Sequence, residues 1–162
     1  MLWSIYGVHA IRKRLLRRWG LRMSHAPRVL FVCVENACRS QMAAGFARMH
    51  GAGRIEAHSA GSKPANAVNP RAISFMAERG CDISAQIPAP LSAFADQAFD
   101  GVITMGCGDA CPWLPARHRE DWALPDPKSL SDEQFRAVRD EIERRVQHLL
   151  SEMDISTPKA LP

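Results

Sequence analysis

Residues 28–40 have the sequence RVLFVCVENACRS. Residues 29–34 form an almost continuous apolar run rich in valine, which is typical of a parallel strand buried on both faces. Apolar side chains then recur at helical spacing through residues 42–49, so we expect a helix from about residue 40 to 50. The stretch therefore predicts a strand, a loop and a helix in succession, which is the repeating unit of a parallel α/β sheet.

The rest of the chain continues to alternate between strand and helix patterns. Apolar runs predict three further strands, the last one brief, at residues 55–60, 100–104 and 121–124. Helices are expected at residues 70–79 and 94–98 and from Ser131 onward, with residues 105–115 as a loop rich in Gly, Cys and Pro. We therefore predict an α/β fold, a three-layer sandwich with a four-stranded parallel sheet flanked by helices.

Local chemistry marks the ends of two of these helices. Asn69 is suited to the N-cap of the helix predicted at residues 70–79, Pro70 to its first helical position and Gly80 to its C′ position. Ser131 and Gln134 form a capping box at the start of the last helix. The buried face of that helix is predicted to comprise Phe135, Val138, Ile142, Val146 and Leu149.

Length and composition are ordinary for one soluble domain. The chain has 162 residues, of which 46% are hydrophobic and 23% charged, and it has no apolar run of the roughly 20 residues that a membrane-spanning helix needs. We expect a basic N-terminal extension at residues 1–26, one catalytic domain at 27–153 and a tail at 154–162. The sequence contains no repeat and no second domain pattern.

The net charge of +4 originates in the N-terminal segment. Residues 1–24 carry six basic groups and no acidic group, and the remainder carries 15 Lys and Arg against 17 Asp and Glu. We therefore expect no nucleic-acid surface on the domain, and no membrane contact outside residues 1–22. Two interpretations of this segment stay open: a start assigned too far upstream, with Met23 as the true start, or a basic amphipathic helix at a membrane surface or on a partner.

The chain contains five cysteines: Cys33, Cys38, Cys81, Cys107 and Cys111. The number is odd and no secretory signal pattern precedes them, so we expect a reducing cytoplasmic location and not a disulfide framework. A zinc site would require the C-x2-C spacing that this set lacks, so we predict no metal site. Cys81 is expected in the core, and the six scattered histidines on the surface.

The loop between the first strand and the first helix has the chemistry of an oxyanion site. Its length allows the backbone N–H groups of Val34, Glu35, Asn36, Ala37, Cys38, Arg39 and Ser40 to converge on an anion at the positive end of a helix. The guanidinium of Arg39 adds a bidentate fork, and the same field stabilises a thiolate on Cys33, the predicted nucleophile. The alternative is a buried structural cysteine beside a solvated arginine, which the strand–loop–helix context disfavours.

Two residues of this loop have further expected roles. Ser40 is placed to hydrogen-bond the Cys33 sulfur, and Asn36 to hold the loop through side-chain bonds to the backbone. Cys38 is expected to be a packing or redox-sensitive thiol. Because ligands of parallel α/β sheets bind at the carboxyl ends of strands, residues 105–112 and Asp126 should face the same crevice as Cys33.

These motifs resemble the low-molecular-weight protein tyrosine phosphatase superfamily and, within it, arsenate reductases of the thioredoxin-coupled type. The resemblance extends over about residues 28–150. It is carried by Val29–Cys33, Asn36, Cys38–Ala43, Ser59–Gly61, Val68–Pro70, Asp82–Ser84, Ile103–Pro112, Asp121–Trp122 and Pro125–Pro127. It implies the four-stranded parallel sheet already expected from the strand pattern.

The resemblance also implies roles for residues outside the loop. Asp126 would be the general acid that protonates the departing oxygen, although an Asp between two prolines is also a common turn former. After Cys33 attacks arsenate, Cys107 would attack the Cys33 sulfur and release arsenite, and Cys111 would then attack Cys107. Thioredoxin or a similar thiol would reduce the final disulfide, with no tightly bound cofactor, and we expect a monomer.

Other functions remain open at this stage. A low-molecular-weight protein tyrosine phosphatase would need only Cys33, Arg39 and Asp126, with water completing its cycle. Tyr6 is the single tyrosine of the chain, and the absence of tyrosine beside Asp126 counts against phosphotyrosine as the substrate. A reductase relying on a low-molecular-weight thiol such as mycothiol would not need the pair Cys107 and Cys111. A non-catalytic anion sensor is a further alternative.

Overall fold

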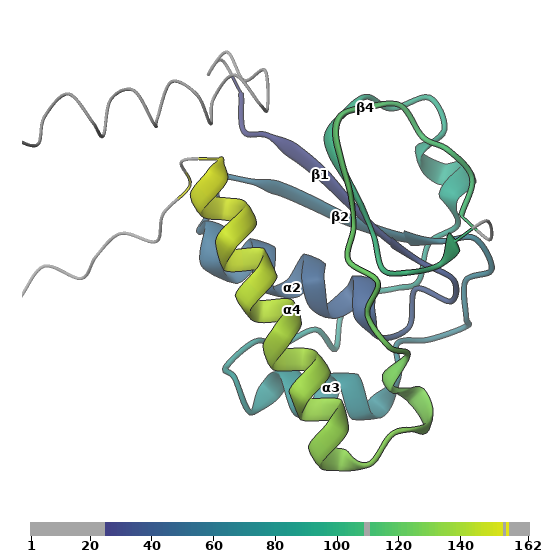
Figure 1. Ribbon diagram of the computed structural model, residues 1–162, viewed down its shortest axis with the longest axis vertical. Helices are drawn as coiled ribbons and strands as arrows, with labels where there is room; N and C mark the ends of the chain where they lie inside the picture. Colours follow the sequence, from purple (N-terminus) through teal and green to yellow (C-terminus); the bar gives the residue numbers. More distant parts are fainter. Residues whose placement is uncertain (1–24, 109–110, 154, 156–162) are drawn as a thin grey trace, which may run out of the picture.

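The computed structural model describes residues 25–108, 111–153 and 155 (Figure 1). The basic extension expected at residues 1–26 and the tail at 154–162 therefore lie almost wholly outside the described residues. The strands are β1 (Arg28–Cys33), β2 (Glu56–Gly61), β3 (Phe99–Thr104) and β4 (Ala116–Asp121). The helices are α2 (Arg39–Gly51), α3 (Pro70–Ala77) and α4 (Asp132–Glu152), with 3-10 turns η1 (Leu91–Phe94) and η3 (Pro127–Ser129).

The four strands form one parallel sheet in the order β2-β1-β3-β4. Val32 of β1 is in register with Ala60 of β2 and with Thr104 of β3, so the carboxyl ends of these strands lie side by side. The predicted α/β class with a four-stranded parallel sheet is confirmed. The oxyanion loop was predicted to lie at these carboxyl ends.

The two faces of the sheet are covered differently. Alternate residues of β1 point to opposite faces, as strand geometry requires. Val29 and Phe31 join the main core with the buried side chains of α2, α3 and α4, which lie together on one side of the sheet (Figure 1). Leu30 and Val32 belong to a second apolar cluster, which includes Leu91 of η1. On that face, a short 3-10 turn and extended segments make the third layer in place of a long helix.

The fourth strand is not where the sequence pattern placed it. Residues 121–124 were expected to form it, but β4 is Ala116–Asp121. The strand has the polar sequence ARHRED, and its central buried residue is His118, whose imidazole contacts the Glu120 carboxylate. A charged edge strand lacks the apolar run on which the prediction depended. The expectation that every histidine lies on the surface is wrong for His118.

The helix boundaries differ less from expectation. The short helix predicted at residues 94–98 is instead the turn η1, which ends at Phe94. Helix α3 ends at Ala77, two residues before the predicted end, because a Schellman-type turn closes it with Gly80 in the left-handed region at a φ of +71°. The capping box of Ser131 and Gln134 is present, and the five predicted apolar residues of α4 are buried.

The packed chain extends beyond the predicted domain boundary at residue 153. Ile155 is buried in the main core, and its N–H donates to the carbonyl of Leu150. Among the described residues, no helix is both long enough and apolar enough to cross a membrane.

Gly61, the last residue of β2, allows the oxyanion loop to pack against the sheet. A Cβ at this position would lie 2.5 Å from the carbonyl oxygen of Val34 and 3.0 Å from the Cβ of Asn36. Neither atom can move without displacing the loop, because the oxygen belongs to the loop backbone and the Cβ is bonded to it.

We expect Gly61→Ala to destabilise the fold by about 1–3 kcal/mol, the usual cost of overpacking, and to weaken phosphate binding at the loop. Urea unfolding and calorimetric titration with phosphate measure the two effects. Gly53→Ala is the matched control: its Cβ meets nothing within 4 Å, but its φ is +79°. The control should lose about 1–2 kcal/mol and keep its phosphate affinity. Equal phosphate affinity in both variants would contradict the assigned role of Gly61.

Candidate active site

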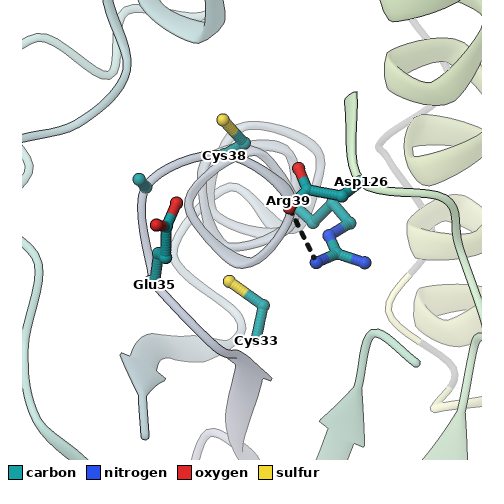
Figure 2. Close-up of a pocket in the computed structure, with 6 residues that line it drawn as sticks. Cys33, Glu35, Cys38, Arg39 and Asp126 are labelled. Atoms are coloured by element: carbon teal, nitrogen blue, oxygen red, sulfur yellow. Dashed lines mark ion pairs between the residues drawn. The ribbon is translucent and has the colours of Figure 1, made fainter. Parts of the chain in front are cut away.

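A pocket lies at the carboxyl end of β1, where the oxyanion loop meets the segment that carries Asp126 (Figure 2). Its lining residues are Cys33, Glu35, Ala37, Cys38, Arg39 and Asp126. The pocket is small, and its empty volume of about 200 Å³ includes open solvent. The size suits a small inorganic anion. All six are predicted site residues, and the pocket brings together three of the predicted catalytic ones, Cys33, Arg39 and Asp126.

The backbone of the loop is turned so that its carbonyl groups face away from the pocket. The carbonyls of Val34, Glu35 and Ala37 accept hydrogen bonds of 2.8–2.9 Å from the N–H groups of Lys63, Ala65 and Asn69, respectively. In a trans peptide the next N–H points the opposite way. The N–H groups of residues 35, 36 and 38 therefore point inward, which is the arrangement that binds an oxyanion.

Asn36 fixes this loop conformation. Its φ of +49° lies in the left-handed region, which asparagine tolerates better than most residues. The side-chain Nδ2 donates to Ser40 Oγ at 2.7 Å, and Oδ1 accepts from the backbone N–H of Ala89 at 2.9 Å and from Gln41 Nε2 at 3.1 Å. The predicted structural role of Asn36 is confirmed by these contacts.

The sulfur of Cys33 faces the centre of the loop (Figure 2). It lies 2.9 Å from Ser40 Oγ and accepts a hydrogen bond from the N–H of Asn36 at 3.2 Å. Both partners can donate a hydrogen bond to the sulfur, which fixes its orientation. The sulfur is therefore held in a fixed position in the lining of the pocket.

The guanidinium of Arg39 connects three segments of the chain. Nη1 donates to the carbonyl of Met105 at 2.9 Å and to that of Leu124 at 2.7 Å, and Nη2 lies 3.6 Å from Asp126 Oδ2. Only 8% of the residue is exposed. These contacts fix the orientation of the guanidinium at the rim of the pocket, so its remaining N–H groups are available to an oxyanion without reorganisation.

Asp126 is presented by a short rigid turn. Pro125 and Pro127 flank it, and its Oδ1 accepts from the backbone N–H of Lys128 at 3.1 Å as the cap of η3. The side chain is 52% exposed, and its other oxygen faces Arg39. The carboxyl group is therefore both reachable by solvent and held next to the pocket, as a general acid requires.

Lys128 is a site residue that the sequence did not reveal. Its Nζ lies 3.0 and 3.1 Å from the two carboxylate oxygens of Glu35, and this contact raises the pKa of the Lys128 ammonium group. The ion pair joins the oxyanion loop to the Asp126 turn and neutralises a carboxylate that would otherwise repel an anion. No local sequence pattern predicts a contact between residues that are 93 positions apart.

Cys107 and Cys111 form a disulfide with a Cα–Cα distance of 5.8 Å, whereas Cys33 is a free thiol. Neither residue of the disulfide lines the pocket. The segment that carries them nevertheless begins at it: Met105 donates its N–H to the carbonyl of Val32, and its own carbonyl is bound by Arg39. Cys107 follows Met105 by two residues, so their Cα atoms are at most about 7 Å apart.

We call residues 105–111, which include Cys107 and Cys111, the redox segment. Its first residues form a defined turn. Gly106 has a φ of +80°, and a Cβ there would lie 2.9 Å from the Cα of Ala123. Asp121 is exposed, and its Oδ1 accepts from Thr104 Oγ1 and from the N–H of Gly106, both at 2.7 Å. Asp121 therefore fixes the exit of β3.

The two other free cysteines are buried, as predicted for Cys81. Burial, reinforced by the negative charge of Asp126, raises the pKa of the Cys38 thiol to about 12. Burial also raises the pKa of the Cys81 thiol. Both therefore stay protonated at neutral pH. Across residues 25–108, 111–153 and 155, no group of three or more His, Cys, Asp or Glu side chains is placed to hold a metal ion.

We expect iodoacetamide to alkylate Cys33 at pH 8 and to leave Cys38 and Cys81 unlabelled, because burial raises the pKa of the Cys38 and Cys81 thiols and the thiolate is the reactive form. Cys38 labelling should rise about tenfold per pH unit up to its pKa of about 12. Peptide mass spectrometry of the folded protein measures all three sites. Phosphate should slow Cys33 labelling selectively, and comparable labelling of Cys38 and Cys33 at pH 8 would contradict the assignment.

Comparisons with known proteins agree with this geometry. A glutaredoxin arsenate reductase from Synechocystis sp. is 43% identical over 129 residues, spanning 78% of this chain and 98% of the relative. A solved arsenate reductase in the phosphate-binding state superposes with a TM-score of 0.72 at 45% identity, over 80% of this chain and 99% of that one. A thioredoxin-dependent arsenate reductase from Corynebacterium glutamicum has a TM-score of 0.70 at 36% identity, over 92% of this chain and 73% of that one. Residues 28–159 match the low molecular weight phosphotyrosine protein phosphatase model, and the chain belongs to that family.

Proposed function

We propose that this protein reduces arsenate to arsenite through a thiol cascade that begins at Cys33. The observation that carries the proposal is the pairing of cysteines: Cys107 and Cys111 are joined, while Cys33 is a free thiol at the base of an anion pocket. This is the distribution of sulfur bonds that such a cascade leaves when it is complete. The arsenate reductases among the relatives support the same reaction.

The first step forms a bond between sulfur and arsenic. The Cys33 thiolate attacks arsenate, the bond from arsenic to a hydroxyl group breaks, and that hydroxyl takes a proton from Asp126 and leaves as water. Backbone N–H groups of the loop and the Arg39 guanidinium hold the remaining oxygens. Arsenic is still pentavalent in this adduct, so nothing has yet been reduced.

The second step moves two electrons from sulfur to arsenic, and the third step moves the resulting disulfide away from Cys33. The Cys107 thiolate attacks the Cys33 sulfur, and the electron pair of the sulfur–arsenic bond remains on arsenic, which leaves as arsenite. Cys111 then attacks the Cys107 sulfur and releases Cys33 as a thiolate. The product is the Cys107–Cys111 disulfide with a regenerated nucleophile.

The second step requires Cys107 to approach Cys33. A disulfide needs Cα atoms within about 4.4–6.8 Å, and adjacent strands are about 4.8 Å apart. Since Met105 hydrogen-bonds β1 next to Cys33 and Cys107 follows by two residues, the required movement is a few ångströms and not a transit across the molecule. Gly106 and Gly108, both at positive φ, flank Cys107 and suit a segment that must change conformation.

Reducing equivalents would come from a protein dithiol. The thioredoxin-dependent relative from Corynebacterium glutamicum supports thioredoxin, and the name of the Synechocystis relative points to glutaredoxin as the other candidate. We further propose that the protein has no tightly bound cofactor, works as a monomer in the cytoplasm and needs no nucleic acid. A reducing cytoplasm suits three free thiols.

A phosphatase activity is the second candidate. The chain belongs to a phosphatase family, and Cys33, Arg39 and Asp126 are arranged as a phosphatase would also require. Hydrolysis of p-nitrophenyl phosphate without any arsenate turnover would establish it instead. The Cys107–Cys111 disulfide favours reduction, since a phosphatase has no use for a second and third thiol.

We expect arsenate-dependent oxidation of NADPH in the presence of thioredoxin and thioredoxin reductase. Cys33→Ser, Cys107→Ser and Cys111→Ser should each lower turnover by roughly 10³-fold or more, because each removes a group on which the cycle depends. Cys81→Ala is the control: Cys81 is a buried free cysteine outside the pocket, and this variant should keep its turnover. Full turnover in Cys107→Ser would exclude the assigned order of attack.

A further inference from the structure

Trp113 lies close to the redox disulfide and is exposed. Within the described part of the chain, the exposed large hydrophobic residues are Ile87, at 79% exposure, and Trp113, at 72%. Trp113 packs into neither apolar cluster, whereas its neighbours Cys111 and Leu114 pack against the second cluster. A tryptophan in water forgoes a large favourable burial, which a partner surface placed over the indole would recover.

The indole is held in place from the side of the sheet. The guanidinium carbon of Arg119, on β4, lies 5.2 Å from the centroid of the Trp113 ring. Arg119 Nη1 also donates to the carbonyl of Leu114, which ties the guanidinium to the segment that carries the indole. Because the ring is oriented before any partner arrives, less side-chain entropy is lost when it is covered. We call Trp113 and Arg119 together the Trp113–Arg119 patch.

The patch is at an accessible edge of the molecule. β4 is the last strand in the sheet order, and Arg119 on it is exposed. Trp113 follows Cys111 by two residues, so their Cα atoms are within about 7 Å of each other. Tryptophan and arginine are also the residue types that most often dominate binding energy in protein interfaces.

We propose that the Trp113–Arg119 patch is the docking surface for the protein dithiol that reduces the Cys107–Cys111 disulfide. The inference rests on the proposed function, and it commits to a thioredoxin-type protein as the occupant. A thiol–disulfide exchange needs the attacking sulfur in contact with the disulfide, which two folded proteins achieve only if their surfaces meet around it. A small dithiol needs no such surface, and this difference makes the proposal testable.

The exchange balances as follows. A thiolate of the reductant attacks the Cys111 sulfur, the Cys107–Cys111 bond breaks, and Cys107 leaves as a thiolate. The second thiol of the reductant loses its proton and attacks the intermolecular disulfide, which releases Cys111 as a thiolate. The protein gains two electrons, and the reductant becomes its own disulfide. Cys107 is then free to attack Cys33 in the next cycle.

The experiment follows reduction of the disulfide in the oxidised full-length protein by reduced thioredoxin, with no arsenate present. We expect Trp113→Ala to lower kcat/KM for thioredoxin about tenfold and Trp113→Phe to stay within about twofold of the parent. Ile87→Ala, the matched control at the other exposed apolar residue, should leave the rate unchanged. Reduction by dithiothreitol should be equal in all four proteins.

Three outcomes would overturn the proposal. The first is an unchanged rate of reduction by thioredoxin in Trp113→Ala. The second is an equal loss of the rate with dithiothreitol, which would indicate a damaged disulfide segment. The third is reduction of the protein by glutaredoxin with glutathione but not by thioredoxin. Because arsenate is left out, these outcomes do not depend on whether the protein reduces arsenate. A protein that thioredoxin reduces through Trp113 but that never forms arsenite would refute the proposed function and leave the docking surface in place.

Discussion

The guanidinium of Arg39 is the contact on which the site depends. It is almost fully buried, it donates to the carbonyls of Met105 and Leu124, and it faces Asp126. Met105 begins the redox segment, and Leu124 leads into the turn that carries Asp126. One side chain therefore sets the position of both segments relative to Cys33. A buried positive charge requires compensation. Two carbonyls and one half-exposed carboxylate supply part of it, and a bound oxyanion would supply the rest.

The architecture explains how one anion site can serve two chemistries. The Cys33 loop, Arg39 and Asp126 are built by β1, α2 and the turn after β4. On the second face of the sheet, η1 and the short stretch that contains Cys111 and Leu114 pack on the apolar cluster in place of a long helix. A cover of short, glycine-containing chain can be displaced at lower cost than a packed helix. The position suits cysteines that exchange partners.

The sequence predicted the parts of this molecule whose signals are local. The valine-rich strand, the loop with Cys33 and Arg39, and the caps at Asn69 and Ser131 each depend on neighbouring residues. Features set by distant contacts were missed. β4 is polar because it lies at the sheet edge, so it lacks an apolar run. Lys128 meets Glu35, and the carbonyls of Met105 and Leu124 meet Arg39, only after the sheet has formed, and backbone carbonyls carry no sequence signature.

The central claim is that Cys107 reaches Cys33 during the reaction. The most direct test uses fully reduced Cys111→Ser protein with one equivalent of arsenate and no reductant, followed by quenching and mapping of disulfides by mass spectrometry. The account predicts one arsenite per protein molecule and a trapped disulfide between Cys33 and Cys107, since the residue that would resolve it is missing. Arsenite release with Cys33 joined to Cys38 instead, or with Cys33 and Cys107 both left as thiols, would contradict it.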